Sequence, residues 1–109
     1  MTHKLPPPIT RYLESVNASD AGMAASSFAV DARVHDEDRD HVGDAAIRAW
    51  AQDTITRYAT QLTVEHATSA GGATVVTTRV AGRFPGSPIE LRFSFWLDGD
   101  RITRLEIAP

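Results

Sequence analysis

The sequence predicts an α+β fold in which three N-terminal helices pack on a curved, mostly antiparallel sheet. In the first 60 residues, apolar side chains recur with the period of about 3.6 residues that is typical of amphipathic helices. From residue 61 onward they alternate with a period of two, and turn sequences at 70–72, 85–88 and 98–100 divide this segment into a four-strand meander. A chain of 109 residues is long enough for one hydrophobic core. We therefore expect a single domain over residues 1–109, with residues 1–8 as a proline-rich lead.

The first two elements are expected to be helices. The prolines at 6–8 can precede a helix but cannot sit inside one. After them, Ile9, Tyr12, Leu13 and Val16 have helical spacing, which predicts a helix that ends near residues 17–19. Asp20 is a suitable cap for a short second helix. The residues of this segment that we expect to face inward are Met23, Ala24 and Phe28.

A strand, a loop and a long helix should follow. The alternation over residues 30–36 predicts one early strand with Val30, Ala32, Val34 and Asp36 on its inner face. Residues 37–40 are all charged and are expected to form a solvated loop. The longest helix is predicted over about 45–59. Its expected inner face consists of Ile47, Trp50, Ala51, Thr54, Ile55 and Tyr58.

The meander is predicted over residues 61–68, 73–83, 88–97 and 101–108. In its third strand, alternation turns Phe93 and Phe95 toward the helices and Arg92 and Trp96 toward the opposite face. Aromatic residues and arginine favour the cores of interfaces, so this outer face predicts a two-fold contact in a homodimer. The alternative is an exposed tryptophan at a sheet edge.

Composition and charge exclude several classes of protein. A hydrophobic fraction of 42% with 23% charged residues is typical of a globular domain. The net charge of -3 gives no basic surface for nucleic acid, and the absence of cysteine excludes disulfides and thiolate chemistry. No apolar run has the length of a membrane span or a secretory signal. We expect a cytoplasmic protein that binds neither nucleic acid nor membranes.

Four stretches of the sequence carry a resemblance to a known family. They are Tyr-Leu-Glu-Ser-Val-Asn-Ala-Ser-Asp at 12–20, Phe-Ala-Val-Asp-Ala-Arg-Val-His-Asp at 28–36, Gly-Asp-Ala-Ala-Ile-Arg-Ala-Trp at 43–50, and the hairpin through 98–100. With the order of elements, they resemble the NTF2-like superfamily, and within it the SnoaL-like and ketosteroid-isomerase-like branch, over residues 9–108. The resemblance implies a cone-shaped cavity between the long helix and the concave sheet face, and a homodimer formed through the outer face. It implies no single reaction, because this fold hosts isomerases, cyclases, dehydratases, hydrolases and proteins with no known activity.

The resemblance also implies three site positions. A tyrosine of the first helix falls on Tyr12 and an aspartate base falls on Asp36. The third position, a carboxylic acid that donates a hydrogen bond, falls on or near Phe93, which cannot donate. Loss of one such donor typically costs about 10²–10³ in rate, which argues against that particular isomerisation.

The residues themselves point to the same candidates, each with a structural alternative. An acid such as Asp36 on an inner strand face has a raised pKa and suits a general base, although it could instead accept backbone hydrogen bonds at the strand end. Tyr12 could hold a developing oxyanion or simply pack in the core. His66 shares strand parity with Leu62 and Val64 and could assist as an acid, or be an ordinary interior or edge histidine.

Metal binding is a weaker interpretation. His35, Asp36 and His41 lack the spacing of a tight metal site, and His35 should point opposite to Asp36. The acids at 36, 38 and 40 superficially resemble a calcium loop, but the glycine and the glutamate that such a loop requires are missing. We expect no metal and no cofactor.

The combined expectation is a bacterial homodimer with an apolar pocket for a small carbonyl-bearing molecule. If the protein is an enzyme, it would perform cofactor-free proton transfer of the isomerase, cyclase or dehydratase type, with Asp36 as base, Tyr12 as oxyanion donor and His66 as assistant. The alternative is a non-catalytic binding or dimerisation domain, its cavity plugged by aromatic side chains such as Phe93, Phe95, Trp50 and Tyr58. The residues expected to line the pocket are Phe28, Val34, Ile47, Trp50, Thr54, Tyr58, Phe93 and Phe95.

Overall fold

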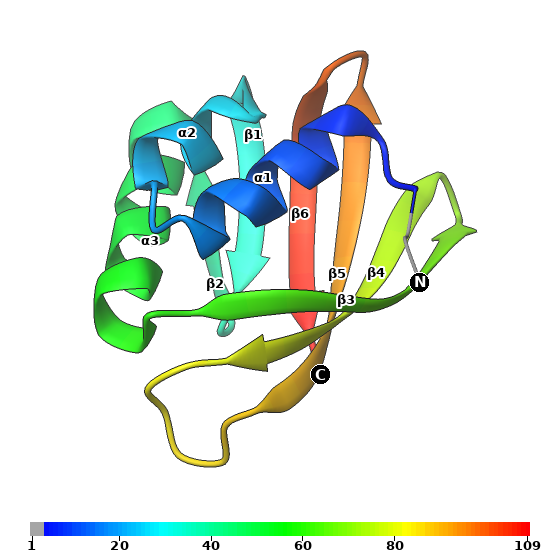
Figure 1. Cartoon of the computed structure of the whole chain (residues 1–109). Helices are drawn as coiled ribbons and strands as arrows, with labels where there is room; N and C mark the ends of the chain where they lie inside the picture. The colour runs from blue at the N-terminus through cyan, green and yellow to red at the C-terminus, as the bar shows by residue number, and fades with distance from the viewer. Residues whose placement is uncertain (1–3) are drawn as a thin grey trace.

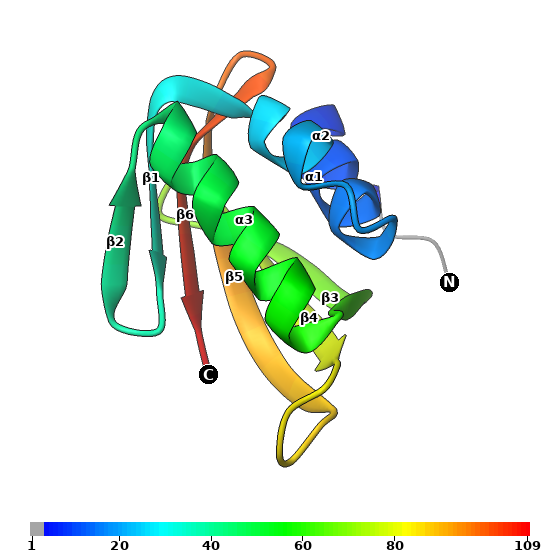
Figure 2. The same ribbon diagram turned by 90° about the vertical axis from the view of Figure 1, so that its left-hand side faces the viewer.

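Three helices lie on one face of a six-stranded sheet in the computed structural model, which describes residues 4–109. Figure 1 shows the sheet strongly curled, with β3 running across the direction of β1 and β6, and Figure 2 shows α3 on the side that α1 and α2 also cover. The elements in chain order are α1 (Pro7–Asn17), α2 (Ala21–Ser26), β1 (Phe28–Asp36), β2 (Arg39–Val42), α3 (Asp44–Tyr58), β3 (Gln61–Ala70), β4 (Ala73–Ala81), β5 (Ile89–Asp98) and β6 (Arg101–Ala108).

The strand order is β2-β1-β6-β5-β4-β3, so the early strand joins the meander at its last strand. β1 and β6 are parallel, whereas the other neighbouring strands are antiparallel. The α+β architecture predicted from the sequence is therefore confirmed, with one strand more than expected.

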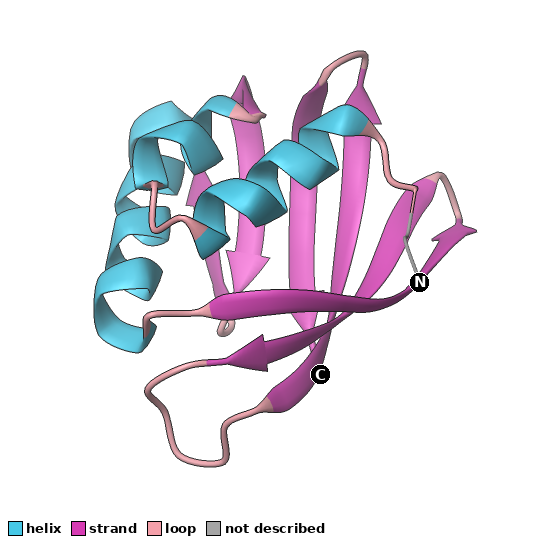
Figure 3. Ribbon diagram, in the orientation of Figure 1, coloured by secondary structure: helices cyan, strands magenta, loops and turns pink. Residues whose placement is uncertain are grey.

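The extra strand is β2, which forms a hairpin with β1. The charged segment 37–40 was expected to be a loop, but only Glu37 and Asp38 form the turn, while β2 begins at Arg39 and pairs with β1. Both turn residues have positive φ, 53° and 61°, as a two-residue type I′ hairpin turn requires. Figure 3 shows this hairpin at one edge of the sheet.

Two details of the N-terminal half differ from expectation. The proline-rich lead is shorter than residues 1–8, because α1 begins at Pro7, where a missing N–H costs nothing; residues 1–3 lie outside the described residues. Asp20 caps α2 as predicted, accepting a hydrogen bond from the backbone N–H of Met23 at 2.9 Å. Met23 itself does not face inward, since half of it is exposed.

β1 begins at Phe28, two residues earlier than expected, and it contains an irregularity. The register of its pairing with β6 shifts between Phe28 and Arg33. Val30 lies inside this irregular segment, where the regular alternation of faces is interrupted, and it is 80% exposed instead of buried. Beyond the bulge, Ala32 and Val34 are buried as the alternation predicted.

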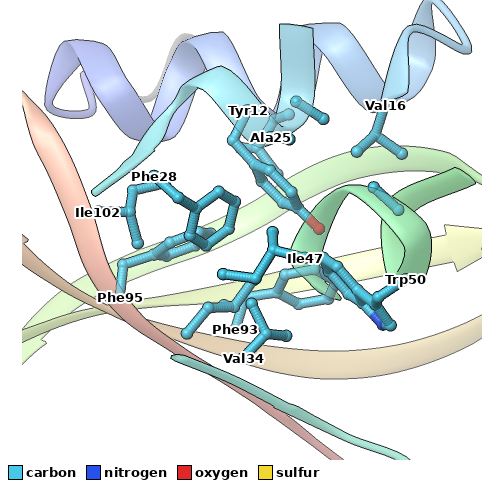
Figure 4. Close-up of a cluster of buried hydrophobic side chains, with 14 of the residues drawn as sticks. Tyr12, Val16, Ala25, Phe28, Val34, Ile47, Trp50, Phe93, Phe95 and Ile102 are labelled. Atoms are coloured by element: carbon cyan, nitrogen blue, oxygen red, sulfur yellow. The ribbon is translucent and has the colours of Figure 1, made fainter. Parts of the chain in front are cut away.

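The core lies between the helices and the concave face of the sheet (Figure 4). Asn17, at the end of α1, ties the helix to the sheet, because its side-chain amide accepts from the backbone N–H of Leu62 at 2.7 Å and donates to the Leu62 carbonyl at 2.9 Å. These two hydrogen bonds hold α1 against the sheet, with its apolar face toward the core. Within residues 4–109, no helix combines the length and the apolar character that crossing a membrane requires.

Candidate functional site

A cavity of about 630 Å³ lies between α1, α3 and the concave face of the sheet. This volume is typical of pockets for small molecules. Its wall is largely apolar, and aromatic rings come from four different parts of the chain. These rings are Tyr12 of α1, Trp50 and Tyr58 of α3, Phe84 of the β4–β5 loop and Phe93 of β5.

Asp36 enters this cavity from the end of β1. The indole Nε1 of Trp50 donates a hydrogen bond to its Oδ2 at 3.0 Å, so one carboxylate oxygen is held from α3. Burial raises the pKa of Asp36, and the hydrogen bond from Trp50 lowers it by less. The nearby charge of Glu37 adds to the increase, and that of His41 opposes it. Asp36 is therefore a better proton acceptor near neutral pH than an ordinary aspartate.

Tyr12 faces the same cavity from α1. Its side chain is only 3% exposed, and its hydroxyl makes no hydrogen bond within residues 4–109. Figure 4 shows the hydroxyl end of the ring directed toward Ile47 and Trp50. Burial, together with the charge of Asp36, raises the pKa of Tyr12, which keeps the hydroxyl protonated. The cavity thus contains a proton acceptor and an unpartnered donor.

Only part of the expected lining borders the cavity. Trp50, Thr54, Tyr58 and Phe93 do so. Four other residues expected to line the cavity do not. Their side chains pack in the hydrophobic core and are at most 6% exposed. They are Phe28, Val34, Ile47 and Phe95.

Sequence reasoning missed the contribution of the β4–β5 loop. Phe84 packs edge-to-face on Tyr58, with ring centroids 5.9 Å apart, and the N–H of Arg83 donates to the carbonyl oxygen of Tyr58 at 2.6 Å. These contacts bring the loop to the end of α3. The sequence of this loop is rich in turn-forming residues and has no regular spacing of apolar side chains. Nothing in the local sequence therefore predicted that the loop would form part of the cavity wall.

His66 lies outside the cavity, which corrects the expectation from strand parity. The register between β3 and β4 shifts between Val64 and His66, so the parity that links Leu62 and Val64 does not extend to His66. Its side chain is exposed. His66 is therefore not among the residues that line the cavity with Asp36 and Tyr12.

The metal interpretation also finds no support in the geometry. His35 Nδ1 lies 2.8 Å from Asp40 Oδ1 in an exposed pair, whereas the His41 ring packs against Trp50 with ring centroids 6.0 Å apart. The part of the chain from residue 4 to residue 109 contains no group of three His, Asp or Glu side chains that could hold a metal ion.

Comparisons with known proteins identify the family. None of the curated proteins matches the chain. Among solved structures, a candidate polyketide cyclase from Sinorhizobium meliloti is 35% identical, with a TM-score of 0.89 and 94% of each chain covered. A protein from Sphaerobacter thermophilus is 28% identical, with a TM-score of 0.71, 92% of this chain and 90% of that chain covered.

A third structure is similar in fold alone. It is a protein from Catenulispora acidiphila with a ketosteroid isomerase-like fold, solved in complex with trimethylamine. It is 18% identical, with a TM-score of 0.83, and the match covers 97% of this chain and 87% of that one. The model of the SnoaL-like domain family matches residues 9–105. The chain therefore belongs to the SnoaL-like family of the NTF2-like superfamily.

Proposed function

We propose that the protein binds a small, largely apolar carbonyl compound in this cavity and catalyses a cofactor-free proton transfer on it. The observation that carries this proposal is the meeting of two groups in one apolar cavity: the Asp36 carboxylate, with one oxygen held by Trp50, and the unpartnered hydroxyl of Tyr12. A SnoaL-like domain with a candidate polyketide cyclase among its relatives is consistent with chemistry of this kind.

The step assigns one task to each group. Oδ1 of Asp36, the oxygen that Trp50 does not hold, takes a proton from the carbon beside the ligand carbonyl. The electron pair of that C–H bond moves into the carbonyl, and the oxygen that becomes negative accepts a hydrogen bond from Tyr12. Return of the proton to another carbon gives an isomer, whereas attack of the enolate carbon on a second carbonyl gives a cyclised product.

Phe93 limits the reaction to substrates that need little oxyanion stabilisation. It lines the cavity but donates no hydrogen bond, so the second donor expected beside Tyr12 is missing at this position. With one donor instead of two, we expect activity only on carbonyl compounds whose α-protons are already acidic.

The test is hydrogen exchange on a model ketone. In D₂O, the protein should accelerate exchange of the α-protons of 2-tetralone, followed by ¹H NMR. Asp36→Asn should return the rate to that of buffer, and Tyr12→Phe should lower it by about 10²-fold. Asp98→Asn, which removes an exposed acid from the β5–β6 hairpin, serves as the matched control and should match the parent protein. Exchange that survives in Asp36→Asn contradicts the proposed base.

A non-catalytic binding function is the second candidate, and Phe93 favours it. In this case 2-tetralone would shift the indole N–H resonance of Trp50, which lines the cavity, without any faster exchange. The indole of Trp96, outside the cavity, supplies an internal reference in the same spectrum.

A further inference from the structure

We propose that the ligand of this cavity carries a cationic, alkylated amine at the end opposite its carbonyl, so that the carbonyl faces Tyr12 and the amine lies at the mouth between Glu37, Asp38 and the aromatic rings. This inference rests on the proposed function, because it names the class of compound that the same cavity takes.

Acidic side chains dominate the charged lining of the cavity. Asp36, Glu37 and Asp38 are consecutive and all line it, whereas no lysine or arginine of residues 4–109 does. His35 lines it as well, and its Nδ1 is paired with Asp40 Oδ1 at 2.8 Å. Glu37 and Asp38 are exposed as well as lining, which places them at the mouth. The hairpin turn fixes this position, since both backbones adopt positive φ.

Arg57 is the cation beside this mouth, and its charge is already paired. Its guanidinium donates to Oδ2 of Asp53 at 2.6 Å and 3.1 Å, and its Nη1 donates to the Tyr58 hydroxyl at 3.0 Å. The Tyr58 hydroxyl in turn lies 3.4 Å from Glu37 Oε2. Glu37 therefore accepts only a long hydrogen bond, from a neutral donor. Arg57 lies near enough to feel the charge of Glu37, but its guanidinium makes its hydrogen bonds with Asp53 and Tyr58, so the Glu37 carboxylate can still contact a ligand.

The mouth also has the aromatic surfaces that bind alkylated ammonium groups. Tyr58 and Phe84 stand edge-to-face there, and Trp50 continues the aromatic wall inward toward Asp36. The Arg57 guanidinium already lies over the Tyr58 ring at 5.0 Å, so the rings left for a ligand are chiefly Phe84 and Trp50. An ammonium group carrying methyl groups sheds water more easily than a bare one, and it is attracted to the faces of such rings.

The inner end of the cavity points independently to a polar group of the ligand. Tyr12 is 97% buried within the chain, and its hydroxyl has no partner in residues 4–109 although it borders the cavity. The hydroxyl is reachable from the cavity, because residues 4–109 contain no fully buried side-chain N or O atom that lacks a hydrogen-bond partner. An acceptor on a ligand can therefore bind it. The inner end of the cavity therefore favours the carbonyl group of the ligand, and the mouth of the cavity favours its cationic group.

The experiment compares two ligands of equal shape. In 4-acetyl-N,N,N-trimethylanilinium and 4-tert-butylacetophenone, the same acetyl group lies opposite a charged and a neutral bulky end. Binding is measured by calorimetry, and the indole N–H resonance of Trp50 confirms the location. The cation should bind at least about tenfold more tightly. Glu37→Gln and Asp38→Asn should each reduce this preference for the cation over the neutral compound.

Asp100→Asn is the matched control, because it removes an exposed acid at the β5–β6 turn, away from the cavity. It should keep the full preference for the cation. Equal binding of the two compounds would overturn the amine inference and leave the proposed function intact. A preference that persists in both mouth variants would overturn the role of Glu37 and Asp38. If neither compound shifts the Trp50 resonance, the cavity is not a binding site and the proposed function fails as well.

Discussion

At the scale of single residues, Asp36 governs how the fold responds to pH. Burial raises its pKa, so the folded chain binds this proton more tightly than the unfolded chain does. The resulting stabilisation is complete below the ordinary pKa of an aspartate and is lost as the pH rises through the raised value. At neutral pH, the ionised carboxylate is a cost to the fold.

We therefore expect Asp36→Asn to be more stable than the parent protein at pH 7, by about 1 kcal/mol. The asparagine oxygen can still accept the hydrogen bond from Trp50, and the buried charge is gone. The advantage should disappear below about pH 4, where Asp36 is neutral. Urea unfolding at both values measures it, with Asp38→Asn at the exposed neighbour as control. A less stable variant at pH 7 would mean that the carboxylate holds the hairpin turn and is not a base.

Trp50→Phe should raise the pKa of Asp36 further. The indole N–H favours the charged carboxylate, and phenylalanine keeps an aromatic ring in its place without the donor. Titration of the Asp36 carboxyl carbon by NMR follows the change, and Trp96→Phe on the outer sheet face should leave the titration unaltered. An unchanged or lower pKa in Trp50→Phe would show that the hydrogen bond does not form in solution.

At the scale of elements, the sequence predicts long periodic segments well and short or irregular ones poorly. The meander and α3 could be predicted because each repeats its period over many residues. β2 could not, because it has four residues, no alternation and mostly charged neighbours. The bulges in β1 and β3 depend on pairing with β6 and β4, so the positions of Val30 and His66 were wrong while that of Asp36 could be predicted.

The packing of the β4–β5 loop on α3 depends on the absence of a side chain at Gly82. A Cβ at Gly82 would lie 2.5 Å from the carbonyl oxygen of Tyr58, so Gly82→Ala must push the loop away from the cavity. We expect a loss of about 1–3 kcal/mol in the free energy of unfolding. In Gly22→Ala, within α2, the new methyl group meets Arg48 no closer than 3.4 Å. This control should instead gain about 0.5–1 kcal/mol. Equal effects of the two substitutions would show that the loop does not pack on α3.

At the scale of the whole molecule, the helices leave one face of the sheet bare. On this outer face, Arg104 lies over the Trp96 ring at 4.9 Å, yet Trp96 remains partly exposed. On the same face, the carboxyl groups of Glu65 and Glu90 lie close enough to raise the pKa of Glu90. A second copy packed on this face would cover the indole, as the expected two-fold dimer requires.

Sedimentation velocity at micromolar concentration should therefore find two chains per particle. Trp96→Asp should raise the dissociation constant of the dimer at least about tenfold, because it removes a central aromatic side chain and places a charged group in the interface. Met23→Asp is the matched control, since Met23 is half exposed but lies on α2, on the helical side of the molecule. A parent protein that sediments as a single chain would overturn the dimer.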